Sequence, residues 1–272
     1  MAEQFGAWRL DALVAVGGLA EVWRAERSAE RSDVPGRTAA VKRLHTHLLV
    51  HDEARRQFAQ ESQLASELPR HPSVTHAIDH GSVGDRPYVA LELAPGADLR
   101  RVIAPPASRD NQVPKRVVLP RARSLAIVAR AAEAAAHLHA HGWIHGDINP
   151  GNLVVDDADG VVLVDLGIAR HAGEAGTVRG THAYMAPEQV RGETWTPATD
   201  VFALGVVLWE LIAGARLFHR GPTWLSMAAV VEDPVPALAD PALDAIARAA
   251  LDKDPAKRTA SASELADQLR RA

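Results

Sequence analysis

The segment from Trp143 to Gly167 constrains the chain more than any other part of its sequence. It carries Asp147 and Asn152 in a stretch rich in glycine and proline, then two short apolar runs with Asp165 directly after the second. Short apolar runs around a turn predict a β-hairpin. An acid that can accept a hydroxyl proton, an amide oxygen five residues later and a second acid beyond the hairpin are what phosphoryl transfer from a metal-bound nucleotide requires.

The same segment resembles the catalytic loop and metal-binding turn of Hanks-type protein kinases, in the style of bacterial Ser/Thr kinases. The resemblance implies ATP as the cofactor, with Mg²⁺ or Mn²⁺ as its metal ion. It assigns Asp147 as the candidate base that orients the acceptor hydroxyl. It assigns Asn152 and Asp165 as the metal ligands, since hard oxygen donors suit a hard cation.

The segment from Gly180 to Glu188 reads G-T-H-A-Y-M-A-P-E and resembles the end of the activation segment of the same family. Its G-T-x-x-Y form, together with Pro150, is similar to Ser/Thr rather than tyrosine kinases. The resemblance implies a protein substrate with a Ser or Thr acceptor, and places Thr181 near the acceptor hydroxyl. Thr177 is a candidate autophosphorylation site, and an ordinary loop threonine is an equally good interpretation.

The composition fits a soluble enzyme with one large or two modest cores, because the chain has 272 residues, of which 47% are hydrophobic and 24% charged. A net charge of −4 gives no reason to expect a nucleic acid or a membrane surface as partner. No cysteine is present, which excludes thiolate catalysis and favours a cytoplasmic location. The N-terminus lacks the pattern of a signal peptide, and the apolar run from Val201 to Ala213 is too short to span a bilayer. The oligomeric state stays open.

Residues 8–27 alternate apolar and polar side chains around two glycines, which predicts two strands joined by a turn. By resemblance this is the glycine-rich loop that covers the nucleotide phosphates, although only the middle glycine of the family's three is kept. Taken alone, an ordinary hairpin turn is the favoured interpretation. The resemblance places five residues of the loop at the nucleotide: Ala15, Gly17, Gly18, Ala20 and Val22.

Residues 38–44 predict a third strand, and residues 53–68 predict a helix whose core-facing stripe is Phe58, Leu64, Ala65 and Leu68. The strand resembles the family's V-A-I-K element, which places Ala40 and Lys42 at the nucleotide. Glu61 stands where the family has the partner of that lysine. The resemblance therefore implies an ion pair between Lys42 and Glu61 that orients the lysine toward the α- and β-phosphates.

Two further strands are expected at residues 74–80 and 87–93, with a turn at 81–85. The second resembles the strand that enters the hinge between the kinase lobes. The remaining nucleotide contacts follow from this match: Leu91 behind the adenine, the Glu92 carbonyl and the Ala94 backbone on the adenine, Asp98 at the ribose, and Asn149 and Leu153 in the catalytic loop. Pro95 and Gly96 mark the boundary between an N-lobe of residues 1–94, which binds nucleotide, and a C-lobe of residues 95–272, which carries the catalytic loop, the activation segment and the substrate site.

The C-lobe is expected to be mainly helical, with helices over residues 121–141, 201–213 and 261–269. No function is assigned to the proline-rich stretch 104–120. By resemblance, Asp200 holds the catalytic-loop backbone and Arg258 pairs with Glu188. His137 and His141 share a helix face, which admits a metal site, but an ordinary helix surface is the favoured interpretation because no acid or cysteine lies near that face.

Three residues depart from the family pattern. Gly146 replaces the arginine that precedes the catalytic aspartate and pairs with a phosphate on the activation segment, so we expect little dependence on loop phosphorylation. Asn149 replaces the lysine that contacts the γ-phosphate, which removes a positive charge and should slow transfer. Leu166 replaces a phenylalanine, which is a tolerable apolar exchange.

These observations predict an α+β protein of two lobes, an N-lobe with an antiparallel sheet and one helix and a mainly helical C-lobe, with ATP in the cleft. The predicted activity is transfer of the γ-phosphoryl group of Mg-ATP to Ser or Thr of proteins, including the chain itself. A pseudokinase that binds nucleotide or serves as a scaffold is the alternative, favoured by Ala15, Ala20 and Asn149. A small-molecule phosphotransferase is a weaker third interpretation.

Overall fold

The structure is a computed structural model that describes residues 3–28, 38–104, 116–174 and 180–272. It has mixed α+β architecture and divides into two compact units. The first comprises Met1–Arg70 and Thr75–Ala94, and the second comprises His71–Val74 and Pro95–Ala272. The expected division at residue 94 assigned residues 71–74 to the N-lobe. They belong to the second unit, because Val74 forms a parallel bridge with Leu163 and Leu163 N donates to the Ser73 carbonyl at 2.8 Å.

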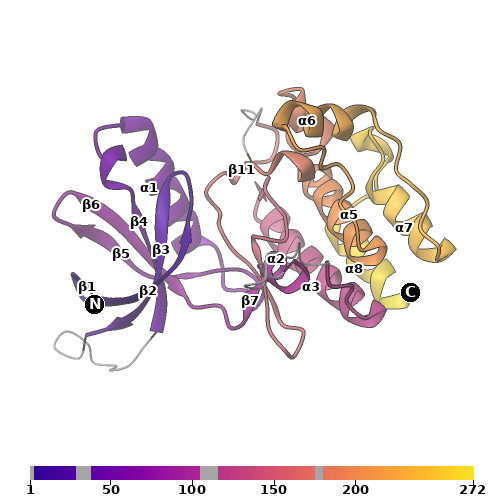
Figure 1. The fold of residues 1–272 in the computed structure, drawn as a ribbon. Coiled ribbons are helices and arrows are strands. Elements are labelled where there is room, and N and C mark those ends of the chain that lie inside the picture. Colours follow the sequence, from indigo (N-terminus) through magenta and orange to yellow (C-terminus); the bar gives the residue numbers. More distant parts are fainter. Residues whose placement is uncertain (1–2, 29–37, 105–115, 175–179) are drawn as a thin grey trace. The chain divides into compact units, whose positions relative to one another are not determined.

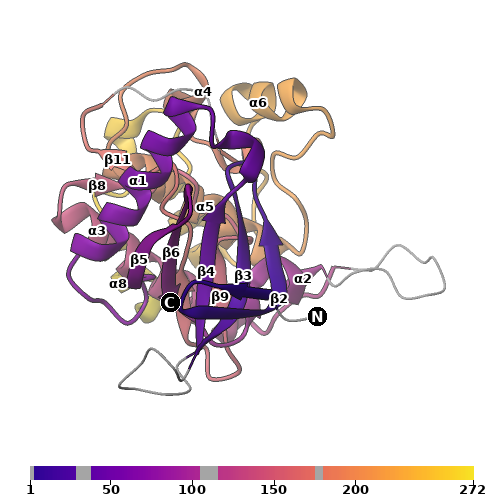
Figure 2. The same ribbon diagram turned by 90° about the vertical axis from the view of Figure 1, so that its left-hand side faces the viewer.

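The first unit is built on a six-stranded sheet in the order β1-β2-β3-β4-β6-β5, in which every neighbouring pair is antiparallel (Figure 2). Its elements are β1 (Glu3–Phe5), β2 (Trp8–Val16), β3 (Ala20–Arg27), β4 (Thr38–Leu44), the short 3-10 helix η2 (Thr46–Leu48), α1 (Asp52–Glu67), β5 (Ala77–Val83) and β6 (Arg86–Glu92). The predicted strands in this region and the predicted helix are confirmed, with shifted ends.

The β5–β6 hairpin differs from the expectation at both ends. β5 starts at Ala77 rather than at Val74, because Val74 belongs to the second unit and bridges to Leu163 there. The expected turn at 81–85 shrinks to Gly84 and Asp85, because the ladder continues to the pair of Val83 and Arg86. Two-residue loops are the commonest way to close an antiparallel pair.

The two faces of this sheet have different surroundings. Side chains alternate between faces along a strand, and directly paired residues share a face. The alternate residues Ala39 and Val41 of β4 pair with Ala25 and Ala90, and all four are fully buried in the core of the unit. Lys42 therefore lies on the opposite face of β4 from that core.

Helix α1 packs against β5 and β6 and presents Phe58, Leu64 and Ala65 as its buried stripe, as predicted. Acidic side chains in its first turn favour the helix start, since they complement the positive end of the helix dipole. The helix ends at Glu67, and Leu68 is extended because Pro69 follows it. The stripe also carries the buried Glu61, whose partner is described below.

The second unit is mainly helical (Figure 1). Its helices are α2 (Leu99–Ile103), α3 (Arg121–Ala140), η3 (His182–Tyr184), α4 (Pro187–Val190), α5 (Pro197–Ala213), α6 (Thr223–Glu232), α7 (Pro241–Ala250), η4 (Pro255–Lys257) and α8 (Ala262–Arg271). Its short strands are β7 (Ala97–Asp98), β8 (Trp143–Ile144), β9 (Leu153–Val155), β10 (Val161–Leu163) and β11 (Arg170–His171). They form one sheet in the order β10-β9-β7 and one pair of β11 with β8.

The core of the second unit lies where α3 packs against α5 and α8. Its three predicted helices are confirmed, but α5 begins at Pro197 rather than at Val201. The earlier start is stabilised because the Thr199 hydroxyl accepts a hydrogen bond from Thr196 N at 3.1 Å, and a proline suits the first helical position. No helix in the described part of the chain is long and apolar enough to cross a membrane.

Candidate active site

The β9–β10 hairpin brings Asn152 and Asp165 to the same end of the second unit. Leu153 pairs with Leu163, and Val164 N donates to the Asn152 carbonyl at 2.9 Å. The loop before β9 closes on itself, because Asn152 N donates to the Asn149 carbonyl at 2.9 Å. Leu153 is fully buried beneath this loop. The hairpin expected from the sequence is therefore present, and it fixes the loop that carries Asp147.

Asp147 is the centre of the hydrogen bonds in this loop. Its Oδ1 accepts from Asn149 Nδ2 at 3.0 Å and from Thr181 N at 2.8 Å. Its Oδ2 accepts from Asn152 Nδ2 at 3.1 Å. The Thr181 bond ties the end of the expected activation segment to the carboxylate. The approach is close, since a Cβ on Gly180 would lie 3.3 Å from Asp147 Oδ1.

The pKa of Asp147 is raised above its ordinary value. Burial is the main cause, and the nearby Asp165 carboxylate adds to the rise. The hydrogen bonds from Thr181 and the proximity of His145 oppose it. A carboxylate with a raised pKa in a hydrogen-bonded loop is a better proton acceptor than an exposed aspartate.

Asn152 and Asp165 offer oxygen donors that fit a magnesium ion. Asn152 donates from Nδ2 both to the Asp147 carbonyl at 2.9 Å and to the Asp147 carboxylate, which leaves its amide oxygen as the atom able to face a cation. Asp165 follows the hairpin and has a φ of +65°, a backbone conformation that is unusual outside glycine. One amide and one acid suit Mg²⁺, which keeps most of its ligands as water and phosphate oxygens. Among the residues that the structure describes, no three His, Cys, Asp or Glu side chains converge on another metal site.

The backbone before Asp147 is held by Asp200, as the sequence predicted. Asp200 Oδ2 accepts from His145 N at 2.9 Å, and Oδ1 accepts from Gly146 N at 2.8 Å. Burial would raise the pKa of Asp200, but the hydrogen bonds from His139 and Gly146 hold it below its ordinary value. The ionised Asp200 carboxylate therefore holds the backbone N–H groups of the loop that carries Asp147.

Asn149 is buried and turned into its own loop. Its Nδ2 donates to the Asp147 carbonyl and carboxylate, and its Oδ1 accepts from Gly151 N at 2.8 Å and Arg100 Nη2 at 3.2 Å. The side chain that replaces the expected lysine therefore stabilises the loop rather than extending from it. The guanidinium of Arg100 still brings a positive charge to this part of the loop.

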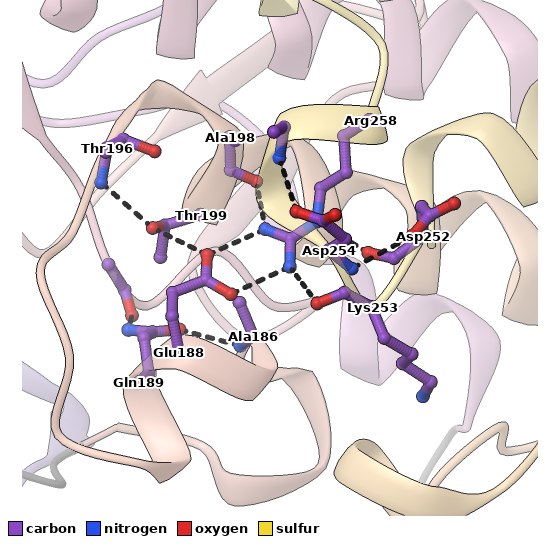
Figure 3. A network of polar contacts seen from close by, with 12 residues as sticks. Ala186, Glu188, Gln189, Thr196, Ala198, Thr199, Asp252, Lys253, Asp254 and Arg258 are labelled. Atoms are coloured by element: carbon purple, nitrogen blue, oxygen red, sulfur yellow. Dashed lines mark hydrogen bonds and ion pairs between the residues drawn. The ribbon is translucent and has the colours of Figure 1, made fainter.

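Glu188 and Arg258 form the predicted ion pair (Figure 3). Arg258 donates from both terminal nitrogens to the two Glu188 oxygens at 2.7 Å, and both side chains are buried. Thr199 donates to Glu188 Oε1 at 3.0 Å, and Arg258 also reaches the carbonyls of Ala198 and Asp252. The network joins the end of the activation segment to the helices that follow it.

Within the first unit, Lys42 Nζ donates to Glu61 Oε1 at 2.5 Å, and both side chains are buried. The ion pair that the resemblance implies between Lys42 and Glu61 is therefore present, and it joins strand β4 to helix α1. A buried ammonium group that is held by a carboxylate can present a fixed positive charge to an anionic ligand.

Four other predicted nucleotide residues lie on the same sheet face as Lys42. Val22 pairs directly with Lys42 and with Ala15, and Ala40 pairs with Leu91. Alternation along β4 puts Ala40 and Lys42 on one side. The register therefore gathers Ala15, Val22, Ala40 and Leu91 around the lysine. Their contact with a nucleotide remains a prediction.

The turn between β2 and β3 contains the other loop residues expected at the phosphates. Gly17 N donates to the Ala20 carbonyl at 2.9 Å, and the Gly17 carbonyl hydrogen-bonds His45 Nε2 at 2.8 Å. Neither Gly17 nor Gly18 has a positive φ. A Cβ at Gly18 would meet no atom within 4 Å, so the turn does not require a glycine there.

Residues expected at the hinge fall on either side of the division between the units. Glu92 ends β6 and forms an ion pair with Arg70 at 2.8 Å, and Ala94 is the last residue of the first unit. Asp98, expected at the ribose, caps α2 by accepting from Arg101 N at 2.9 Å. Helix capping is thus one role of Asp98 that the sequence prediction missed, although an aspartate before an apolar turn is a recognisable cap signal.

The ring of His137 stacks on that of His71 and is tilted against that of His141, the residue that follows α3. The ring of His137 lies 4.8 Å from that of His71 and 4.6 Å from that of His141. His141 Nδ1 is hydrogen-bonded to the His137 carbonyl at 2.8 Å, so that nitrogen is engaged. The candidate phosphorylation site Thr177 lies outside the described residues.

Three residues around the loop were missed by the sequence interpretation. His139 hydrogen-bonds Asp200 at 2.8 Å, and Gln189 Nε2 donates to the Gly146 carbonyl at 2.8 Å. Trp195 packs its indole against Gly146. Gln189 directly follows the A-P-E motif, which could have drawn attention to it, whereas nothing near Trp195 in the sequence indicates its contact.

The family model described as "Protein kinase domain" matches residues 14–269, which is nearly the whole chain. The chain belongs to the protein kinase family. The mixed α+β architecture described above is consistent with the fold of that family.

Relatives of this kinase domain are bacterial Ser/Thr kinases. It is 33% identical over 281 residues to "Serine/threonine-protein kinase PknB" of Mycolicibacterium smegmatis, covering 97% of this chain and 42% of that protein. It is 31% identical over 275 residues to "Serine/threonine-protein kinase PknD" of Mycobacterium tuberculosis, covering 97% and 39%. "Probable serine/threonine-protein kinase PknB" of Corynebacterium glutamicum is 31% identical over 285 residues, with 97% and 42% covered. The chain thus spans about two fifths of the length of these relatives.

Proposed function

We propose that this kinase domain transfers the γ-phosphoryl group of ATP to Ser or Thr hydroxyls of proteins, including its own. The observation that carries the proposal is that Asp147 accepts hydrogen bonds both from Asn152 of its own loop and from the backbone of Thr181, 34 residues later. The residue types and their spacing are those that phosphoryl transfer requires. The family and the Ser/Thr kinase relatives support the same activity.

Asp147 is the residue that orients the acceptor hydroxyl in this proposal. Of the three hydrogen bonds described above, Oδ1 accepts two, from Asn149 and the Thr181 backbone, and Oδ2 accepts one, from Asn152. Oδ2 therefore has room to accept the proton of a Ser or Thr hydroxyl. The Thr181 backbone bond fixes the segment along which a protein substrate would lie.

Asn152 and Asp165 would hold the metal ion through their oxygens. Bound Mg²⁺ or Mn²⁺ supplies neutralising charge to the phosphates of ATP. Lys42, oriented by Glu61, would bind the α- and β-phosphates, and the sheet face of Ala15, Val22, Ala40 and Leu91 would take the base and sugar. These roles rest on the register and contacts given above.

A nucleotide-binding pseudokinase is the second candidate, and Asn149 is the observation that favours it. Its amide brings no cation to the transferring group, which should lower the rate. Two observations argue against a pseudokinase: the Lys42–Glu61 ion pair is intact, and the Asp147 carboxylate is held by hydrogen-bond donors such as Asn149. The nearby Arg100 guanidinium also supplies positive charge that Asn149 lacks.

The test is incubation of the chain with γ-labelled ATP and Mg²⁺, a generic protein acceptor and an aminoglycoside in parallel reactions. Phosphoserine or phosphothreonine on protein is the expected result. An ATP-dependent rise in melting temperature without any transfer would identify a pseudokinase. Label on the aminoglycoside alone would identify a small-molecule phosphotransferase.

A further inference from the structure

The indole of Trp195 fills the space beside Gly146. Trp195 lies between α4 and α5 and is fully buried. A Cβ on Gly146 would come within 2.2 Å of Trp195 Cζ3 and within 3.0 and 3.1 Å of two further ring atoms. No side chain larger than hydrogen fits at position 146 without moving the indole. The glycine and the tryptophan are therefore a matched pair across 49 residues of sequence.

Gly146 is also held on its other sides. Its φ of +77° is a left-handed conformation that favours glycine. Its N–H donates to Asp200 Oδ1 and its carbonyl accepts from Gln189 Nε2, each at 2.8 Å. The indole covers the remaining side, at Cα. The residue directly before Asp147 thus has little freedom to move while Trp195 is in place.

Trp195 holds the first part of the activation segment as well. Gly173 N donates to the Trp195 carbonyl at 2.9 Å, and Trp195 N donates to the Glu174 carbonyl at 3.1 Å. The Arg170 guanidinium lies 4.7 Å from the centre of the indole, and Arg170 pairs with Ile144 across β11 and β8. One buried residue therefore joins the catalytic loop, the start of the activation segment and the chain before α5.

We propose that Trp195 is a positioning residue for Asp147, and that its packing makes the order of the catalytic loop independent of phosphorylation in the activation segment. This inference rests on the proposed kinase function. An arginine at position 146 would join loop and segment through a phosphate. Here a buried indole and two backbone hydrogen bonds join the same segments, and neither needs a phosphate.

Kinetics of Trp195→Ala test the positioning role. We expect kcat to fall about ten- to a hundredfold, because misplacing a catalytic group by about 1 Å has an effect of this size. The KM for ATP should stay within about twofold of wild type, since Lys42 and its sheet face are untouched. Trp195→Phe, which keeps a packed ring, should retain most of the rate. The matched control is Trp209→Phe, a buried indole on α5 that donates to the Pro236 carbonyl.

Coupling between positions 146 and 195 gives a second test. In the wild-type background, Gly146→Ala places a methyl group against the indole, so kcat should fall. In the Trp195→Ala background that collision is absent, and Gly146→Ala should have a smaller effect. Strictly additive effects of the two substitutions, or a wild-type kcat for Trp195→Ala, would overturn the proposal.

Hydrogen exchange separates this inference from the proposed activity. The backbone N–H groups of residues 145–149, 151 and 152 should exchange at least about tenfold faster in Trp195→Ala than in wild type or Trp209→Phe, because local opening becomes easier. Unchanged exchange there would refute positioning by Trp195, whether or not the chain transfers phosphate. Thr177→Ala should keep the wild-type kcat. A loss of kcat in this variant would refute the claim that the order of the catalytic loop is independent of phosphorylation. If wild type shows no transfer although exchange responds as expected, the proposed function fails and the structural coupling stands.

Discussion

Removal of the Arg258 guanidinium should destabilise the second unit strongly. The Arg258 side chain is fully buried, and its charged partner is Glu188, to which it donates two hydrogen bonds of 2.7 Å (Figure 3). Replacing it with methionine keeps the approximate length of the side chain but leaves the Glu188 carboxylate buried, with Thr199 as its remaining side-chain donor among the residues that the structure describes. Breaking a buried pair from one side costs about 3–5 kcal/mol, because the remaining charge has lost both water and its partner.

The loss can be measured by thermal or urea unfolding of Arg258→Met. At roughly 2–4 °C per kcal/mol for a unit of this size, the melting temperature should fall by about 6–20 °C. The control is Lys257→Met, because Lys257 and its partner Asp254 lie 3.4 Å apart with 70% and 48% of their side chains exposed. An exposed pair contributes about 0–1 kcal/mol, so this variant should melt within about 4 °C of wild type.

The double variant Arg258→Met/Glu188→Met tests the reasoning further. It removes both charges, so it should be less destabilised than the sum of the two single variants. A loss below about 1 kcal/mol for Arg258→Met would refute the argument, since it would mean that Glu188 finds water or another partner at no cost. Additive losses would refute it as well.

Three further predictions concern charged groups. Lys42→Met should lower phosphoryl transfer about a hundredfold or more and remove the ATP-dependent rise in melting temperature, whereas Glu61→Gln, which still accepts a hydrogen bond, should lose less activity. Transfer from labelled ATP measures the activity of both variants. A fully active Lys42→Met would contradict the role assigned to Lys42. Asp147 must be ionised to accept a proton, so kcat/KM should fall as pH drops through its raised pKa. Asn149→Ala removes a hydrogen-bond donor to the ionised carboxylate, so the fall in kcat/KM should begin at a higher pH in this variant. Identical pH profiles for wild type and Asn149→Ala would exclude an effect of Asn149 on the pKa of Asp147. Burial lowers the pKa of Lys253 to about 8, so between this pH and its ordinary value near 10.5 the unfolded chain binds more protons than the folded one, and the free energy of unfolding should rise with pH. Lys253→Met should lack this contribution when unfolding by urea is measured across that pH range. An equal rise of the free energy of unfolding with pH in both proteins would contradict the prediction.

The residues most easily predicted from sequence were those whose chemistry and spacing are both restricted. Lys42, Glu61, Asp147, Asn152 and Asp165 each carry a group that few other residues can supply, and the pairs that involve them follow from family order. Strands β2 to β4 and helix α1 were predictable because their apolar residues repeat with clear periods.

Contacts that join distant segments through shape were not predictable. Nothing local indicates that Trp195 faces Gly146, because the only signal is that a glycine stands where the family has an arginine. Short strands such as β7 and β11 were missed because two residues carry no periodicity. The early start of α5 was missed because its first turn is polar, with Thr199 and Asp200 buried by hydrogen bonds rather than by hydrophobicity.

The most direct test of the account is transfer of label from γ-labelled ATP, in the presence of Mg²⁺, by wild type, Asp147→Asn and Asp157→Asn. Asp157 is an exposed acid in the turn of the β9–β10 hairpin and serves as the matched control. We predict phosphoserine or phosphothreonine with wild type and Asp157→Asn, and at least about a hundredfold less with Asp147→Asn. Equal transfer by all three proteins, or none by wild type, would contradict the claim that Asp147 orients the hydroxyl in a protein kinase.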